Sequence, residues 1–160
     1  MASTWRKRLL TTLYGHARAG AVTAIVALLT TGGERVRAAD YVVRDYAIAE
    51  PLSAMPGDPQ RGAAIVVDRG RGNCLSCHAV PVDADFFGTT GPTLAAVGAR
   101  LNAAQLRLRL VDPKVINPMT MMPAYFNTEG LYRVAPEYAG KPILSAQEIE
   151  DVVAFLLTLK

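Results

Sequence analysis

Residues 72–80 (GNCLSCHAV) constrain this chain most, because they place two cysteines at C-x-x-C spacing with a histidine directly after the second. Three chemistries use that spacing: a redox-active dithiol, half of a zinc site, or the covalent attachment of a haem. Each of them requires different structure and different partner residues around the cysteines. The rest of the sequence must therefore discriminate between them.

The first 38 residues have the pattern of an export signal. A basic segment at residues 6–8 (RKR) precedes an apolar run at residues 19–29 (AGAVTAIVALL), which is shorter than the roughly 20 residues of a membrane-spanning helix. We predict cleavage between Ala38 and Ala39, release of the mature protein into the periplasm, and no stable membrane span after processing. The alternative is a retained N-terminal membrane anchor, which the length of the apolar run disfavours.

Removal of this leader changes the charge of the chain. Residues 1–38 hold six of the 17 basic residues and one of the 14 acidic residues, which leaves 11 basic and 13 acidic residues and a formal net charge of −2. The basic character of the full sequence therefore belongs to the predicted leader. No run rich in lysine and arginine remains, so no nucleic-acid partner is expected.

The mature chain is predicted to consist of an extended N-terminal arm at residues 39–57 and one domain at residues 58–160. The arm contains Pro51, Pro56 and Gly57 and shows no sustained helical periodicity. Its length exceeds what a lone carrier protein needs. It could therefore lie across a partner chain.

Cap residues predict three helices in the domain. The first covers residues 59–69 after an Asp-Pro start signal, the second runs from Asn102 to Pro113, and the last follows a capping box formed by Ser145 and Glu148. The side chains expected to face the core are Ala63, Ile65, Val66 and Val67 in the first helix, Leu106, Leu110 and Val111 in the second, and Ile149, Val152, Val153, Leu156 and Leu159 in the last.

Long loops rich in glycine and proline separate these helices, at residues 80–98 and 114–144, and the C-x-x-C-H motif is expected to form a single turn. Strand signals are few. The predicted fold class is therefore all-α, with three to four short helices. Because a small domain buries a smaller fraction of its surface, an embedded apolar cofactor would complete the interior.

The ligand count and the helical context favour haem over the other two chemistries. A structural zinc site needs about four ligands, and the mature chain offers only Cys74, Cys77 and His78, since His16 lies in the leader. A thioredoxin-like dithiol follows a strand, whereas this pair follows a predicted helix and a glycine-rich turn. We therefore predict one haem c, bound through two thioethers to the cysteines, with the adjacent histidine on the iron.

The second axial ligand is predicted to be a methionine, because no other histidine remains in the mature chain. The methionines considered are Met55, Met119, Met121 and Met122. The last three lie in residues 117–125 (NPMTMMPAY), and Met122 is preferred because Pro123 fixes it from behind. The alternatives are packing of Met119 and Met121 against the haem edge, or an open sixth position on the iron.

Five segments carry a family resemblance: residues 56–62 (PGDPQRG), 65–78 (IVVDRGRGNCLSCH), 91–101 (GPTLAAVGARL), 117–125 (NPMTMMPAY) and 131–156 (LYRVAPEYAGKPILSAQEIEDVVAFL). On these segments the chain resembles class I cytochromes c. More narrowly, it resembles the SoxX family, the small monohaem subunits of SoxAX complexes of thiosulfate oxidation. The resemblance implies the class I cytochrome c fold, in which short helices surround one covalently attached haem.

The resemblance also implies roles for individual residues. Cys74 and Cys77 would attach the haem, His78 would be the proximal ligand, Met122 would be the distal ligand, and the Pro92 carbonyl would accept the histidine ring N–H. The doublet Met121-Met122 differs from the single methionine usual before this proline. A shift of one residue in the distal ligand therefore stays open.

In the SoxX family the SoxA partner carries the reactive cysteine, and the complex joins thiosulfate to a cysteine of the carrier SoxYZ. The resemblance therefore implies a heterodimer of the L-cysteine S-thiosulfotransferase type, in which this chain accepts electrons for a downstream cytochrome c or oxidase. The chain itself would hold no catalytic nucleophile, because both of its cysteines would be committed to haem. The alternatives are a free soluble electron carrier and a small exported interaction domain with an incidental C-x-x-C.

Overall fold

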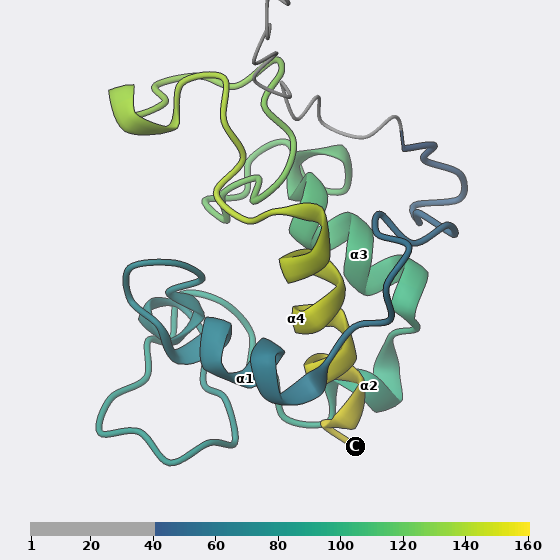
Figure 1. Ribbon diagram of the computed structural model, residues 1–160. Helices are drawn as coiled ribbons and strands as arrows, with labels where there is room; N and C mark the ends of the chain where they lie inside the picture. Colours follow the sequence, from purple (N-terminus) through teal and green to yellow (C-terminus); the bar gives the residue numbers. More distant parts are fainter. Residues whose placement is uncertain (1–40) are drawn as a thin grey trace, which may run out of the picture. The chain divides into compact units, whose positions relative to one another are not determined.

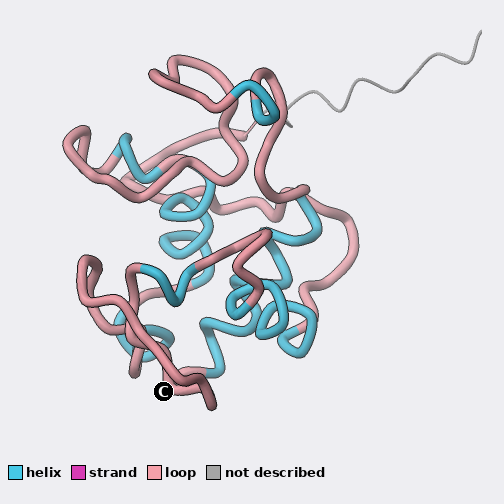
Figure 2. Tube along the Cα trace, turned by 90° about the vertical axis from the view of Figure 1, so that its left-hand side faces the viewer, coloured by secondary structure: helices cyan, strands magenta, loops and turns pink. Residues whose placement is uncertain are grey.

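The computed structural model describes residues 41–160; the predicted leader and its cleavage site lie outside these residues. Short helices joined by long loops make up this part of the chain (Figures 1 and 2). The α-helices are α1 (Pro59–Val67), α2 (Val97–Arg100), α3 (Ala103–Val111) and α4 (Ala146–Thr158), and the 3₁₀ turns are η1 (Cys74–Ser76), η2 (Pro113–Val115) and η3 (Pro136–Tyr138). Within residues 41–160 no strand forms beyond an isolated bridge, so the predicted all-α class is confirmed.

The three predicted helix starts are confirmed by their caps. The Asp58 carboxylate accepts the N–H groups of the first turn of α1, with proline at the first helical position. Asn102 and Gln105 form a reciprocal capping box at α3, which the sequence prediction had identified only as a helix start. Ser145 and Glu148 form the predicted capping box at α4. In each case a side chain satisfies backbone donors that the helix itself leaves unpaired.

Two details of the predicted helices are wrong. The first helix ends at Val67 rather than residue 69, because Asp68 already adopts an extended conformation. Val67 is consequently 40% exposed instead of facing the core. The short helix α2 was not predicted, since it lies in a segment rich in glycine and follows Ala96 in a left-handed conformation.

Helix α4 organises the core by contacting α1, α2 and α3. The contact with α1 is close: a Cβ atom at Gly62 would lie 2.0 Å from the backbone oxygen of Asp151, so only glycine fits at this crossing. The largest fully buried apolar side chains are Phe126, Ile48, Leu108, Leu144, Ile149, Val66, Val111 and Val152. The helices thus form one core, beside which the loops carry the functional residues.

The described part of the N-terminal arm, residues 41–57, packs against this domain. Ile48 is 1% exposed, and its N–H donates to the carbonyl of Ala104 in α3 at 3.0 Å. Backbone pairing between Arg44 and Ala47 closes a tight turn at the start of the arm. The described part of the arm therefore packs as an ordered part of this domain.

Candidate functional site

A cavity of about 1080 Å³ contains every site residue predicted from the sequence. Its walls come from α1, α3, α4, the C-x-x-C-H turn and the loops at residues 90–94 and 117–123. The predicted site residues among them are Cys74, Cys77, His78, Pro92 and Met122. Apolar side chains of three helices, Val66, Leu106, Leu110, Val152 and Leu156, line the interior. This is a setting for a large apolar group with a few polar attachment points.

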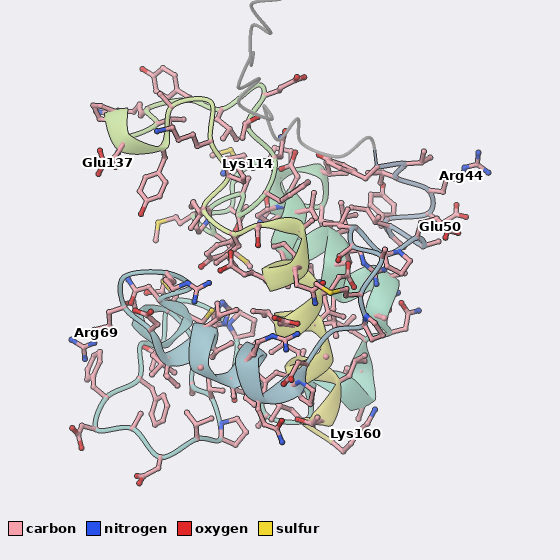
Figure 3. The ribbon with its side chains drawn as sticks, in the orientation of Figure 1. Arg44, Glu50, Arg69, Lys114, Glu137 and Lys160 are labelled. Carbon is pink, nitrogen blue, oxygen red and sulfur yellow. The ribbon has the colours of Figure 1, made fainter. Side chains whose placement is uncertain are left out.

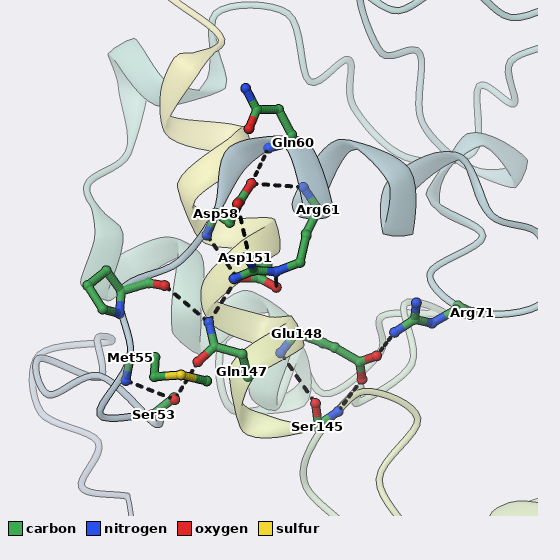
Figure 4. A network of polar contacts seen from close by, with 11 residues as sticks. Ser53, Met55, Asp58, Gln60, Arg61, Arg71, Ser145, Gln147, Glu148 and Asp151 are labelled. Atoms are coloured by element: carbon green, nitrogen blue, oxygen red, sulfur yellow. Dashed lines mark hydrogen bonds and ion pairs between the residues drawn. The ribbon is translucent and has the colours of Figure 1, made fainter.

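The C-x-x-C-H motif forms the predicted single turn. Asn73 adopts a left-handed conformation, and η1 follows it, with the His78 N–H donating to the Cys74 carbonyl at 2.9 Å. Arg71, just before the turn, forms an ion pair with Glu148 of α4 (Figure 4). The turn is therefore held both within itself and against the last helix, which fixes the direction of its side chains.

The ring of His78 is fixed by its neighbours. Its Nδ1 lies 2.7 Å from the carbonyl oxygen of Pro92, which is the contact that the family resemblance implied. A carbonyl can only accept, so Nδ1 carries the proton and Nε2 keeps a lone pair for a metal. Gly91 makes the close approach possible, because a Cβ there would lie 2.3 Å from Cε1 of the ring. The histidine is thus preset as a ligand.

The environment of Cys74 does not suit a reactive dithiol. Burial raises the pKa of Cys74 to about 11, whereas a reactive dithiol needs a lowered thiol pKa. Residues 41–160 also contain no cluster of three or more His, Cys, Asp or Glu side chains that could hold a metal ion. Both thiols line the cavity, where they can hold a large group by two covalent attachments.

Placement separates the four candidate methionines. Met55 and Met119 do not line the cavity, and they are 62% and 87% exposed. Met121 reaches the cavity wall but is 78% exposed, whereas Met122 is half-buried and packs against the core. The arrangement thus favours Met122 as the group that faces the cavity.

Short polar contacts shape the loop that carries Met122. The Met122 N–H donates to Thr120 Oγ1 at 3.2 Å, and the Thr120 N–H donates to the Asn117 carbonyl at 3.0 Å. The ammonium of Lys114, labelled in Figure 3, lies 3.4 Å from the Thr120 carbonyl and 3.5 Å from that of Met122. The loop therefore has a defined conformation, which a weak thioether ligand requires.

The cavity-lining residues that sequence reasoning missed include Arg100, Arg109 and Tyr125. Arg100 donates to the carbonyls of Thr93 and Ala95, beside the Pro92 loop. Tyr125 stands in the quoted segment 117–125, so its proximity to the methionines was a signal that could have been used. No such signal existed for Arg109, since its orientation depends on how α3 packs.

Among residues 41–160, no helix is both long enough and apolar enough to cross a bilayer.

Comparison with known proteins agrees with this geometry. The Cytochrome c family model matches residues 59–160, and no curated protein matches the chain. The chain belongs to the cytochrome c family. It is also similar to a chain in the crystal structure of SoxXA from P. pantotrophus, with 38% identity and a TM-score of 0.71, over 77% of this chain and 96% of that one. It is therefore a SoxX-like monohaem cytochrome, with one haem c bound covalently to Cys74 and Cys77.

Proposed function

We propose that this chain is the electron-transfer subunit of a periplasmic SoxAX-type complex, in which it forms a heterodimer with a SoxA-like cytochrome. The similarity to SoxXA carries this proposal, because it extends over 96% of the matched chain at 38% identity. The arrangement around the cavity supports electron transfer, since His78 and Met122 face the same space from different loops. When bound, the haem supplies a one-electron acceptor whose potential His/Met ligation raises.

The proposed reaction of the complex joins thiosulfate to a cysteine of a carrier protein. A thiol and thiosulfate give an S–S bond between the carrier sulfur and the outer sulfur of thiosulfate, with release of one proton and two electrons. This chain passes the two electrons on one at a time, to a downstream cytochrome c or oxidase. His78 and Met122 are the proposed axial ligands, and the Pro92 carbonyl keeps the proton on Nδ1 of the histidine.

The bond-forming chemistry belongs to another chain in this proposal. The sequence has two cysteines, and both attach the haem. Of its two histidines, His78 is the proposed iron ligand and His16 falls in the predicted leader. This chain therefore supplies no thiol for the S–S bond, and the catalytic cysteine is assigned to the SoxA-like partner.

Purification of the exported protein tests the complex and its location. We expect the periplasmic fraction to contain a chain without its leader, carrying one haem by mass and bound to a second haem protein. Its haem should be reduced by thiosulfate only when the partner and a carrier with a free cysteine are both present. If the protein purifies as a monomer, and if deletion of its gene leaves thiosulfate oxidation intact, the results would instead support a free soluble electron carrier.

Substitution of the methionines tests the distal ligand. We expect Met122→Ala to abolish the near-infrared sulfur-to-iron band of the oxidised protein, because the thioether sulfur is removed. Met119→Ala is the matched control, since that side chain is 87% exposed and lies outside the cavity lining. If Met121→Ala loses the band and Met122→Ala keeps it, the distal ligand is Met121 rather than Met122.

A further inference from the structure

Tyr125 occupies a distinctive position at the end of the methionine loop. It is 7% exposed, it lines the cavity, and it follows Met122 by three residues. Its N–H donates to the carbonyl of Leu110 in α3, and its carbonyl accepts the N–H of Leu144, both at 2.9 Å. The backbone at Tyr125 is thus fixed from two sides, so the direction of its side chain is set by the core.

The phenol of Tyr125 reaches the segment just before the haem-attachment turn. Its hydroxyl donates to the carbonyl oxygen of Gly72 at 2.7 Å, two residues before Cys74. No other residue of segment 117–125 hydrogen-bonds to residues 72–78 in the described chain. One tyrosine therefore connects the loop that carries Met122 to the turn that carries the cysteines and His78.

The surroundings make this hydrogen bond costly to lose. The phenol is buried, and burial raises its pKa, so it remains a neutral donor at physiological pH. Both Tyr125 and Gly72 are buried, so water does not readily replace a missing partner. Removal of the hydroxyl would leave the Gly72 carbonyl without its donor, and it would free the methionine loop on that side.

We propose that Tyr125 is a positioning residue that holds the methionine loop against the haem-attachment turn and so keeps the Met122 thioether on the iron. This inference rests on the proposed ligation by Met122. A thioether is a weak axial ligand, so an external ligand competes with it each time the loop opens. The hydrogen bond from Tyr125 to Gly72 lowers the population of that open state.

Binding of imidazole to the oxidised holoprotein measures the open state. We expect Tyr125→Phe to bind imidazole about ten-fold more tightly than the wild type, because one buried hydrogen bond no longer opposes opening. Tyr138→Phe is the matched control, because it also removes a phenol hydroxyl, but from an exposed tyrosine in the loop at residues 127–141. It should leave the affinity for imidazole unchanged. A Tyr125→Phe protein with a lower unfolding midpoint but wild-type imidazole affinity would reduce the tyrosine to a purely structural role and overturn the proposal.

Met122→Ala separates failure of this inference from failure of the proposed ligation. If Met122→Ala does not tighten imidazole binding, Met122 is not the ligand and both proposals fall. If it tightens binding while Tyr125→Phe does not, only the positioning role falls. A crystal structure of the wild-type imidazole complex gives a test that needs no variant: the bond from Tyr125 to Gly72 should be broken, and an intact bond would overturn the inference.

Discussion

The N-terminal arm (residues 41–57) and the loop at residues 127–141 are both irregular, yet the structure treats them in opposite ways. The arm buries Ile48 and hydrogen-bonds to two helices, whereas residues 132–141 of the loop are all exposed. Glu137 lies in the 3₁₀ turn η3 of this loop, away from the α-helices (Figure 3). Both segments contain prolines, and the arm has the larger share of apolar residues, which favours its burial. Charged side chains on α3 and α4, which meet the arm and not the loop, add to the difference.

A buried ion pair anchors the middle of the arm. Arg107 of α3 is 4% exposed, and its Nε donates to Glu150 of α4 at 2.7 Å. The same guanidinium donates from Nη1 to the carbonyl of Ile48 at 2.7 Å, and the Leu52 N–H donates to Glu150 Oε1 at 2.9 Å. Each charge therefore satisfies a backbone group of the arm as well as its partner. Such a pair is best understood as fixing one arrangement of the chain.

A second carboxylate anchors the end of the arm. Asp151 accepts the N–H of Asp58 at 2.8 Å, and it forms two hydrogen bonds with the guanidinium of Arg61 at 2.8 and 2.9 Å (Figure 4). Gln147, one turn earlier on α4, donates to the Pro56 carbonyl at 3.2 Å and accepts the Ser53 hydroxyl. Polar side chains of a single helix thus substitute for the secondary structure that the arm lacks.

Removal of Glu150 should give the largest difference in stability between a change that affects the arm and a change in the loop. We expect Glu150→Ala to lower the free energy of unfolding by about 3–5 kcal/mol, because Arg107 is left buried without a counter-ion. Urea denaturation of the holoprotein measures this. Glu137→Ala is the matched control in the exposed loop and should change stability by no more than about 0.5 kcal/mol. Similar losses in both variants would show that the arm is not anchored by its charges.

Glycines in the two segments offer a second, smaller contrast. A Cβ at Gly57 in the arm would lie 2.1 Å from the backbone oxygen of Glu150, so Gly57→Ala should cost about 2–3 kcal/mol through displacement of the arm. Gly140 in the loop has nothing within 4 Å but a φ of +66°, so Gly140→Ala should cost only about 1 kcal/mol of backbone strain. Thermal unfolding of the two variants compares them. Equal costs would mean that the arm yields as easily as the loop does.

The same contrast shows which features could be predicted from sequence. Caps such as Asn102 and Ser145 were predictable, because a capping side chain acts on residues two or three positions away. The docking of the arm was not, since Arg107 and Glu150 meet it across separations of 59 and 98 residues. Arg107 also sits within a run of alternating leucine and arginine on α3, where a solvent-facing arginine is the ordinary expectation.

Some residues of the candidate site could be predicted from local sequence, and others could not. Cys74, Cys77 and His78 are adjacent in sequence, so their chemistry constrains them before any tertiary structure forms. Pro92 was found through the family resemblance alone, because nothing in its local sequence indicates that its carbonyl accepts a hydrogen bond. Tyr125 was missed because its role depends on Gly72, 53 residues earlier in the chain. Long-range pairs of this kind are defined only by the folded structure.

The acid dependence of stability should give the smallest and most selective difference. The hydrogen bonds from Arg61 hold the pKa of Asp151 at about 2, below its ordinary value of 3.8, so the stability that this carboxylate contributes is complete above about pH 4 and is lost as the pH falls toward 2. Because Arg61 is half exposed, we expect the loss to be about 1–2 kcal/mol.

Asp151→Asn should remove this acid-dependent part of the stability curve, whereas Asp83→Asn, in an exposed loop, should keep it. Hydrogen exchange should show the Asp58 amide losing protection between pH 4 and 2 in the wild type, while the exposed amides of residues 132–134, which donate no hydrogen bond, stay unprotected throughout. Protection of the Asp58 amide that persists at pH 2 would mean that Asp151 does not hold the end of the arm through its charge.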